Sequence, residues 1–343
     1  MATARPQGEA VRRFIIDNVA SHPADIAKRA ATRFHITRQA VHKHLRRLVE
    51  EGILTEAGQT RSRSYGLAVL SRWERSYPIQ AGLEEDIVWT QDIRPVLGEL
   101  PDNVLRLWQH GFTEMFNNAI DHSEGTQVHV EVRRTAADTE MIIADDGFGI
   151  FRRIRKLLGL LDERHAILEL SKGKLTTDPA HHTGEGIFFT SRMFDTFNIL
   201  SGGVSFSHTD GEANDWIRDN PQYQDGTTVW LRLRNQTSRT TKKVFDEYVS
   251  GEDYDFSRTV VPVVLAQYVG DLLVSRSQAK RVLARVDLFR TVVFDFSGID
   301  SIGQAFADEI FRVFAQSHPE IEFQFIHANA SVRKMIIRAR AHR

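Results

Sequence analysis

The stretch "FTEMFNNAIDHS", residues 112–123, decides how the middle of the chain folds. Its apolar residues recur at helical spacing and form one stripe: Phe112, Met115, Phe116, Ala119 and Ile120. Polar residues form a second stripe without lysine or arginine: Glu114, Asn118, Asp121 and His122. An ordinary solvated face usually mixes both signs of charge. The pattern therefore predicts a helix that is anchored in a core and presents carboxylate, amide and imidazole groups at one place.

Three glycine-containing motifs follow this helix in the chain. "ADDGFGI" (residues 144–150) ends a predicted strand, "HHTGEGIFF" (181–189) precedes a predicted helix, and "DGTTVWLRL" (225–233) enters a predicted strand. Each motif alone is weak, because short glycine pairs are common in turns. The joint order, with the expected strand or helix beside each motif, is specific.

This order resembles the ATP-binding fold of the GHKL superfamily, over roughly residues 85–235. That superfamily includes gyrase B-type topoisomerases, MutL repair proteins, heat-shock chaperones of the 90-kilodalton class, and histidine and anti-sigma kinases. The resemblance implies an α/β sandwich, the Bergerat fold, that binds ATP and Mg²⁺.

The resemblance also implies roles for individual residues. Glu114 matches the carboxylate that activates water in the branch that hydrolyses ATP, and Asn118 matches the magnesium ligand. Asp145 matches the acceptor for the adenine amine. The remaining residues implied to contact nucleotide or to support the site are Asp121, Gly147, Gly149, Gly184, Gly186 and Thr227.

The segment 151–183 is the lid that the resemblance implies. It carries several cations, any of which has the length to reach a γ-phosphate, and their spacing does not distinguish them: Arg152, Arg153, Arg155, Lys156, Lys172 and Lys174.

The chain is expected to be a multidomain α/β protein. Residues 1–70 predict three helices and a hairpin, which resembles the winged helix-turn-helix of transcription regulators. Residues 71–104 predict a connecting segment packed on the next domain, residues 105–240 the ATP-binding domain, and residues 241–343 a further small α/β domain.

Residues 1–70 are expected to bind duplex DNA. They carry a net charge of +6 and the remainder carries −7, so the basic end is suited to a polyanion. The predicted recognition helix and wing supply the candidate contacts: Arg38, Gln39, His42, Lys43, Arg61 and Arg63.

Residues 241–343 resemble a STAS-like domain, through "DFSGIDSIGQAFADEIF" (295–311). STAS antagonists of anti-sigma kinases carry a phosphorylated serine just before the following helix, a place that falls near residues 303–305 here. Ser301 is out of register with that place, so phosphorylation of this domain by its own chain is not expected. A protein partner is expected to bind through the domain.

Composition excludes several classes of protein. Cysteine is absent, which excludes disulfides, zinc–thiolate sites and thiol catalysis, and suits a reducing cytoplasm. No apolar run is long enough for a membrane span. We expect a cytoplasmic, homodimeric, ATP-responsive DNA-binding regulator. Two alternatives stay open: a serine/threonine protein kinase of the anti-sigma type, and a scaffold that binds ATP without turnover.

Overall fold

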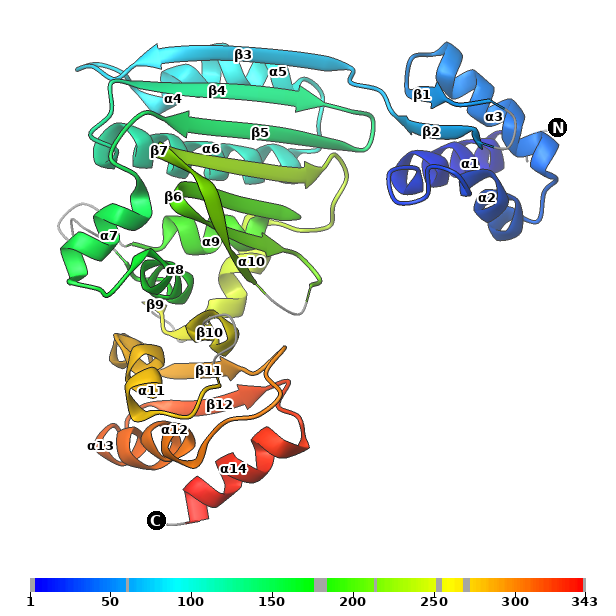
Figure 1. Ribbon diagram of the computed structural model, residues 1–343. Coiled ribbons are helices and arrows are strands. Elements are labelled where there is room, and N and C mark those ends of the chain that lie inside the picture. Colours follow the sequence, from blue (N-terminus) through cyan, green and yellow to red (C-terminus); the bar gives the residue numbers. More distant parts are fainter. Residues whose placement is uncertain are drawn as a thin grey trace.

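The chain forms a multidomain α/β protein with several sheets (Figure 1). The computed structural model describes residues 4–59, 62–175, 184–212, 215–250, 255–267 and 272–341. Within these residues no helix combines the length and apolarity that crossing a bilayer requires.

The N-terminal part consists of three helices and a two-stranded antiparallel sheet. The helices are α1 (Ala4–Asn18), α2 (Ile26–Phe34) and α3 (Arg38–Glu50), and the strands are β1 (Leu54–Ala57) and β2 (Ser64–Leu67). Helix α3 begins where the Thr37 side chain accepts a hydrogen bond of 3.2 Å from the Ala40 N–H, which makes Thr37 its N-cap. Buried residues of this part form their own hydrophobic cluster, which includes Ile15, Val41 and Leu45.

The central part is built on a five-stranded antiparallel sheet with the order β3-β4-β5-β7-β6. The strands are β3 (Ser71–Pro78), β4 (Gln127–Arg134), β5 (Asp138–Asp145), β6 (Thr196–Thr209) and β7 (Trp216–Arg234). The edge strand β3 comes from the segment that the sequence marked as a connection, and it pairs with β4 along its whole length.

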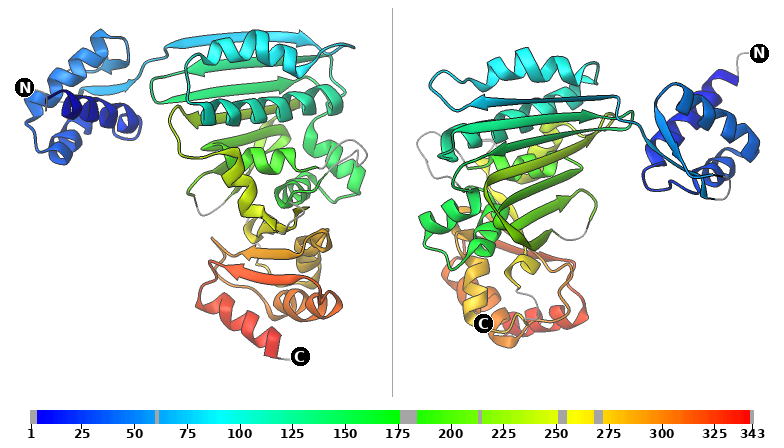
Figure 2. Two further views of the ribbon diagram at one scale, coloured as in Figure 1. Left: turned by 180° about the vertical axis from the view of Figure 1, so that it is seen from behind. Right: turned by 45° about the horizontal axis from the view of Figure 1, so that its top comes forward.

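Helices cover one face of this sheet and leave the other face open (Figure 2). They are α4 (Glu85–Val88), a π-helical turn (Trp89–Ile93), α5 (Arg94–Leu97), α6 (Asp102–His122) and α9 (Gly186–Met193). The apolar stripe of α6 explains its position, because Phe112, Met115 and Phe116 are almost fully buried. Helices α7 (Ile150–Leu158) and α8 (Glu163–Lys172) follow β5 and lie toward the C-terminal part (Figure 1).

The C-terminal part contains a three-stranded parallel sheet with the order β10-β11-β12. The strands are β10 (Arg258–Pro262), β11 (Thr291–Asp295) and β12 (Glu322–Ile326). The surrounding elements are a 3₁₀ turn (Val263–Ala266), α11 (Arg276–Leu283), a second 3₁₀ turn (Val286–Leu288), α12 (Gln304–Asp308), a π-helical segment (Glu309–Phe314), α13 (Ala315–Ser317) and α14 (Ala330–Ala341).

Helix α10 (Thr241–Tyr248) packs on the central part, although the expected boundary precedes it. The Phe245 ring lies 4.3 Å from that of Phe189 in α9 and 5.7 Å from that of His110 in α6. A short ladder of β8 (Val249–Ser250) and β9 (Asp255–Phe256) then leads to β10.

Candidate functional site: a cavity between helix α6 and the sheet

A cavity of about 300 Å³ lies between residues of α6, the sheet and the helices α7, α8 and α9. Its walls include predicted site residues from four separate motifs: Glu114, Asn118, Asp145, Gly184, Gly186 and Thr227. Asn118 and Glu114 come from α6, Asp145 from the end of β5, and Thr227 from β7. The fold therefore brings together residues that are more than a hundred positions apart in the chain.

The remaining predicted site residues do not line the cavity. Asp121 is exposed on the last turn of α6. Gly147 and Gly149 lie in the turn between β5 and α7, directly after Asp145. The backbone at Gly147 approaches Ser123 so closely that an added Cβ would lie 2.1 Å from the Ser123 carbonyl oxygen. Glycine is needed at Gly147 to close the end of α6 against this turn.

Asp145 is held in place by backbone donors. Its Oδ1 accepts hydrogen bonds from the N–H of Gly147 at 2.9 Å and of Thr227 at 3.2 Å. Burial raises the pKa of Asp145, while these two N–H groups oppose the rise by stabilising the carboxylate. The Thr227 hydroxyl oxygen accepts from the Ile150 N–H at 3.0 Å, which ties β7 to the start of α7. The carboxylate is therefore fixed in orientation at the cavity wall.

Glu114 packs against the first residue of α9. A Cβ added to Gly186 would lie 1.8 Å from Glu114 Oε2, so any other residue at this position would displace the carboxylate. The N-terminal turn of a helix has N–H groups without intrahelical partners, and these favour negative charge nearby. The lack of a side chain at Gly186 thus allows α9 to approach α6 and fixes the position of Glu114.

The cationic side chains of the expected lid lie in different environments. Arg153 lines the cavity, and its Nη1 donates to the His122 carbonyl at 2.9 Å and to Glu124 Oε1 at 2.7 Å. The Arg152 guanidinium stacks on Phe148 and Tyr223. Lys172 is fully buried against the C-terminal part.

The structure describes the expected lid as far as Leu175, and residues 176–183 lie outside the described residues. The Leu175 N–H donates to the Gly184 carbonyl at 3.1 Å, which joins the two ends of the segment beside the cavity.

The sequence did not identify the apolar wall of the cavity. This wall consists of Met115, Ala119, Ile143, Ile150, Ile154, Leu170, Leu175, Ile187, Ile199 and Val229. The sequence pattern could have identified Ile143 as a cavity residue, because Ile143 stands two residues before Asp145 and so faces the same side of β5. No sequence pattern distinguishes Leu170 and Ile199 as cavity residues, since core residues and cavity residues share the same periodicity.

The predicted DNA contacts lie on the N-terminal part. Arg38, Gln39, His42 and Lys43 are all exposed on α3. Arg63 is exposed and pairs with Glu56 across the β1–β2 hairpin at 2.9 Å. Arg61 lies outside the described residues.

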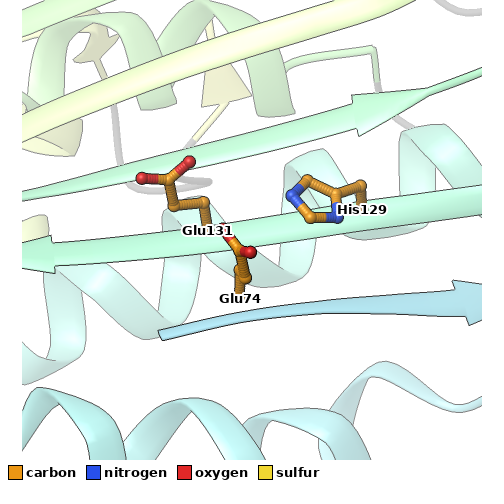
Figure 3. A group of neighbouring side chains, drawn as sticks. All are labelled: Glu74, His129 and Glu131. Carbon is orange, nitrogen blue, oxygen red and sulfur yellow. The ribbon is translucent and has the colours of Figure 1, made fainter. Parts of the chain in front are cut away.

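A separate cluster occupies the open face of the sheet, where Glu74, His129 and Glu131 lie close together (Figure 3). Arg72 pairs with Glu131 at 3.0 Å and with Glu74 at 3.3 Å, and the Ser76 hydroxyl lies 3.0 Å from His129 Nδ1. The arginine compensates the carboxylates without a metal ion, so this cluster is explained as a surface ion-pair network.

Residues 278–333 match the family model described as STAS-like domain of unknown function (DUF4325). The C-terminal part is a STAS-like domain. The match contains β11, β12 and the helices between them. No curated protein matches the chain.

The STAS-like domain places Ser301 in the loop before α12, where this residue is exposed. Gly303 precedes the first residue of α12, and its N–H donates to the Leu273 carbonyl at 2.8 Å. A Cβ on Gly303 would lie 2.7 Å from Val274 Cα. The loop between β11 and α12 is therefore packed tightly against Val274.

Proposed function

We propose that this protein is an ATP-responsive DNA-binding regulator, with a GHKL-type central domain that binds Mg²⁺·ATP and a winged helix that binds DNA. One observation carries the proposal: residues chosen from four sequence motifs line a single cavity. The ligand would supply a phosphoanhydride bond that is activated by a bound metal ion.

The cavity residues fit this ligand. The apolar wall suits a purine ring, and Asp145 is a partly buried, oriented acceptor suited to the adenine exocyclic amine. Asn118 offers an amide oxygen, which is a ligand type that magnesium accepts. Glu114, one helical turn earlier, lines the same cavity, and in the proposed function its carboxylate polarises a water molecule.

The N-terminal part supports the DNA-binding half of the proposal. Its net charge is +6, and the side chains of α3 that would meet base edges or phosphates are exposed. ATP regulates DNA binding only if it binds one arrangement of the domains better than another. A homodimer whose arrangement depends on nucleotide is the form we propose, with a protein partner for the STAS-like domain.

Incubation with γ-labelled ATP and candidate partner proteins tests the chemistry. Release of free phosphate supports an ATPase. Labelled protein supports a serine/threonine kinase instead, and neither product supports a scaffold.

Two variants assign the roles of the helix residues. Glu114→Gln keeps the shape of the side chain and removes the base, so it should bind ATP like the wild type and lose about 10²–10⁴-fold in hydrolysis. Asn118→Ala should lose the magnesium-dependent part of the affinity. Phosphate release at the wild-type rate by Glu114→Gln would show that Glu114 is not the base.

Binding of genomic fragments with and without ATP tests regulation. Affinity should fall steeply with salt, because each neutralised phosphate releases counterions. Replacing Arg61 and Arg63 by alanine should weaken binding to every sequence. Affinity that is independent of both salt and these changes would remove DNA from the proposal.

A further inference from the structure

Helix α8 contacts both the cavity and the STAS-like domain. Leu170 lines the cavity, as does Leu175 just beyond the helix. Lys172, two residues after Leu170, faces the other way and is fully buried. One short helix thus forms part of the cavity wall and part of a domain interface.

The interface is held by an unusual buried ionic group. Lys172 Nζ donates to Glu169 Oε1 at 2.7 Å, to the Ala284 carbonyl at 2.7 Å and to the Arg281 carbonyl at 3.2 Å. The two carbonyls belong to the end of α11 and the residue that follows it. The Thr259 hydroxyl of β10 donates to the Lys172 carbonyl at 2.7 Å. These bonds attach the end of α8 to two elements of the C-terminal part.

The same interface contains buried polar atoms that lack hydrogen bonds. Arg285 Nη2 donates to the Lys174 carbonyl, which ties the start of the second 3₁₀ turn to the residues just after α8. Its Nη1 lies 3.6 Å from Glu169 Oε2, and within the described part of the chain neither of these two atoms has a hydrogen-bond partner. Both ring nitrogens of His165 are likewise buried without a hydrogen bond there, and Nε2 lies 3.7 Å from Glu169 Oε1. A buried polar group without a hydrogen bond lowers the stability of the docked state. Water would hydrogen-bond these groups if the interface opened. A buried ionic interface of this kind is often no more stable than an apolar interface of the same shape, because the desolvation of its charges offsets their attraction.

We propose that docking of the STAS-like domain on α8 controls the cavity: the docked domain fixes the wall formed by Leu170 and Leu175, and undocking releases it. Ligand binding in the cavity and docking of the domain are then coupled, and each changes the other by the same factor. The identity of the ligand as Mg²⁺·ATP rests on the proposed function, whereas the coupling itself does not.

Arg285→Asn in the full chain is the test variant. Arg285 has a φ of +59°, a backbone conformation that asparagine tolerates, so the change removes the guanidinium without adding strain. Lys280→Ala is the matched control, because Lys280 lies on α11 with 71% of its side chain exposed. Amide hydrogen exchange measures local opening at the interface and at the cavity wall. Calorimetry measures the affinity for Mg²⁺·ATP.

We expect Arg285→Asn to accelerate exchange in residues 165–175 and also in residues 186–189 of α9, on another wall of the cavity. Its affinity for Mg²⁺·ATP should change by about 5-fold or more, in the range typical of allosteric coupling. Lys280→Ala should match the wild type in both measurements. In the wild type, Mg²⁺·ATP should alter exchange at residues 281–288.

Two results separate the claims. If Arg285→Asn loosens residues 281–288 but leaves ATP affinity and residues 186–189 as in the wild type, the interface is only structural and the inference is overturned. If the wild type binds no ATP, the proposed function fails. In that case exchange at residues 186–189 alone decides the inference: acceleration supports it and no change overturns it.

Discussion

The two ends of the chain are attached to the central sheet in different ways. The N-terminal part packs its apolar residues in a cluster of its own and continues into the sheet through strand β3. The C-terminal part shares one hydrophobic cluster with the sheet and its helices, and adds the buried group around Lys172. Packed side chains therefore form a continuous route between the cavity helices and the STAS-like domain.

The N-terminal part lacks this route within the described residues. Its covalent connection is the short segment after β2, where the Leu70 N–H donates to the Arg134 carbonyl of β4 at 2.8 Å. In the proposed function, a signal to this part acts through the position of β3 at the sheet edge or through a second copy of the chain. We expect mutations at the two ends to differ accordingly in size and in reach.

The largest effect is expected from Lys172→Met. Removing the cation leaves Glu169 buried and unpaired, at a cost of about 3–5 kcal/mol in the free energy of unfolding. Adding Glu169→Gln should recover most of the loss, because the buried charge is then gone. The control is Arg29→Ala in the N-terminal part, whose exposed pair with Asp25 at 2.7 Å should not affect the midpoint of chemical denaturation. A single Lys172→Met variant as stable as the wild type would contradict the shared interface.

An intermediate effect is expected from pH, through His110 in α6. Burial lowers the pKa of His110 from 6.5 to about 4, so the unfolded chain binds its proton first as pH falls. Stability should decline between about pH 6.5 and pH 4, by up to about 3 kcal/mol for this group. His110→Phe should flatten that part of the pH profile of the denaturation midpoint. An unchanged slope would show that other groups dominate.

The smallest effect is expected from Thr37→Ala, which removes the N-cap of α3 at a cost of about 1 kcal/mol. Because the N-terminal part has its own core, only its transition should move in a calorimetric scan. Equal shifts of all transitions would contradict the independence of this part.

Local signals in the sequence located the elements of the cavity well. Glycine turns, the acid that ends β5 and the two stripes of α6 are each readable within about ten residues, and they lead to Asp145, Gly186, Asn118 and Glu114. The STAS-like domain was likewise recognisable from one strand and the helix after it, and the family match confirms it.

Features that depend on distant packing were not readable. The sequence predicts a connection where β3 lies, because the exposed residues lack a clear alternation, and only pairing with β4 makes this segment a strand. The sequence places Lys172 among the cations that are long enough to reach a γ-phosphate. Its carbonyl partners at Arg281 and Ala284 lie more than a hundred residues away, so no local pattern indicated that it faces the C-terminal part.

Calorimetric titration of the wild type and Asp145→Ala with Mg²⁺·ATP and Mg²⁺·GTP tests the central claim most directly. The account predicts that the wild type binds ATP much more tightly than GTP. Adenine presents an amine that donates a hydrogen bond to Asp145, whereas guanine presents a carbonyl at the same position, which cannot donate. Asp145→Ala should lose at least about 1–3 kcal/mol of ATP affinity, or about 5- to 150-fold, because the amine would be left without its acceptor. Equal affinities of the wild type for ATP and GTP, or unchanged ATP binding by Asp145→Ala, would contradict the assignment of this cavity to adenine nucleotide.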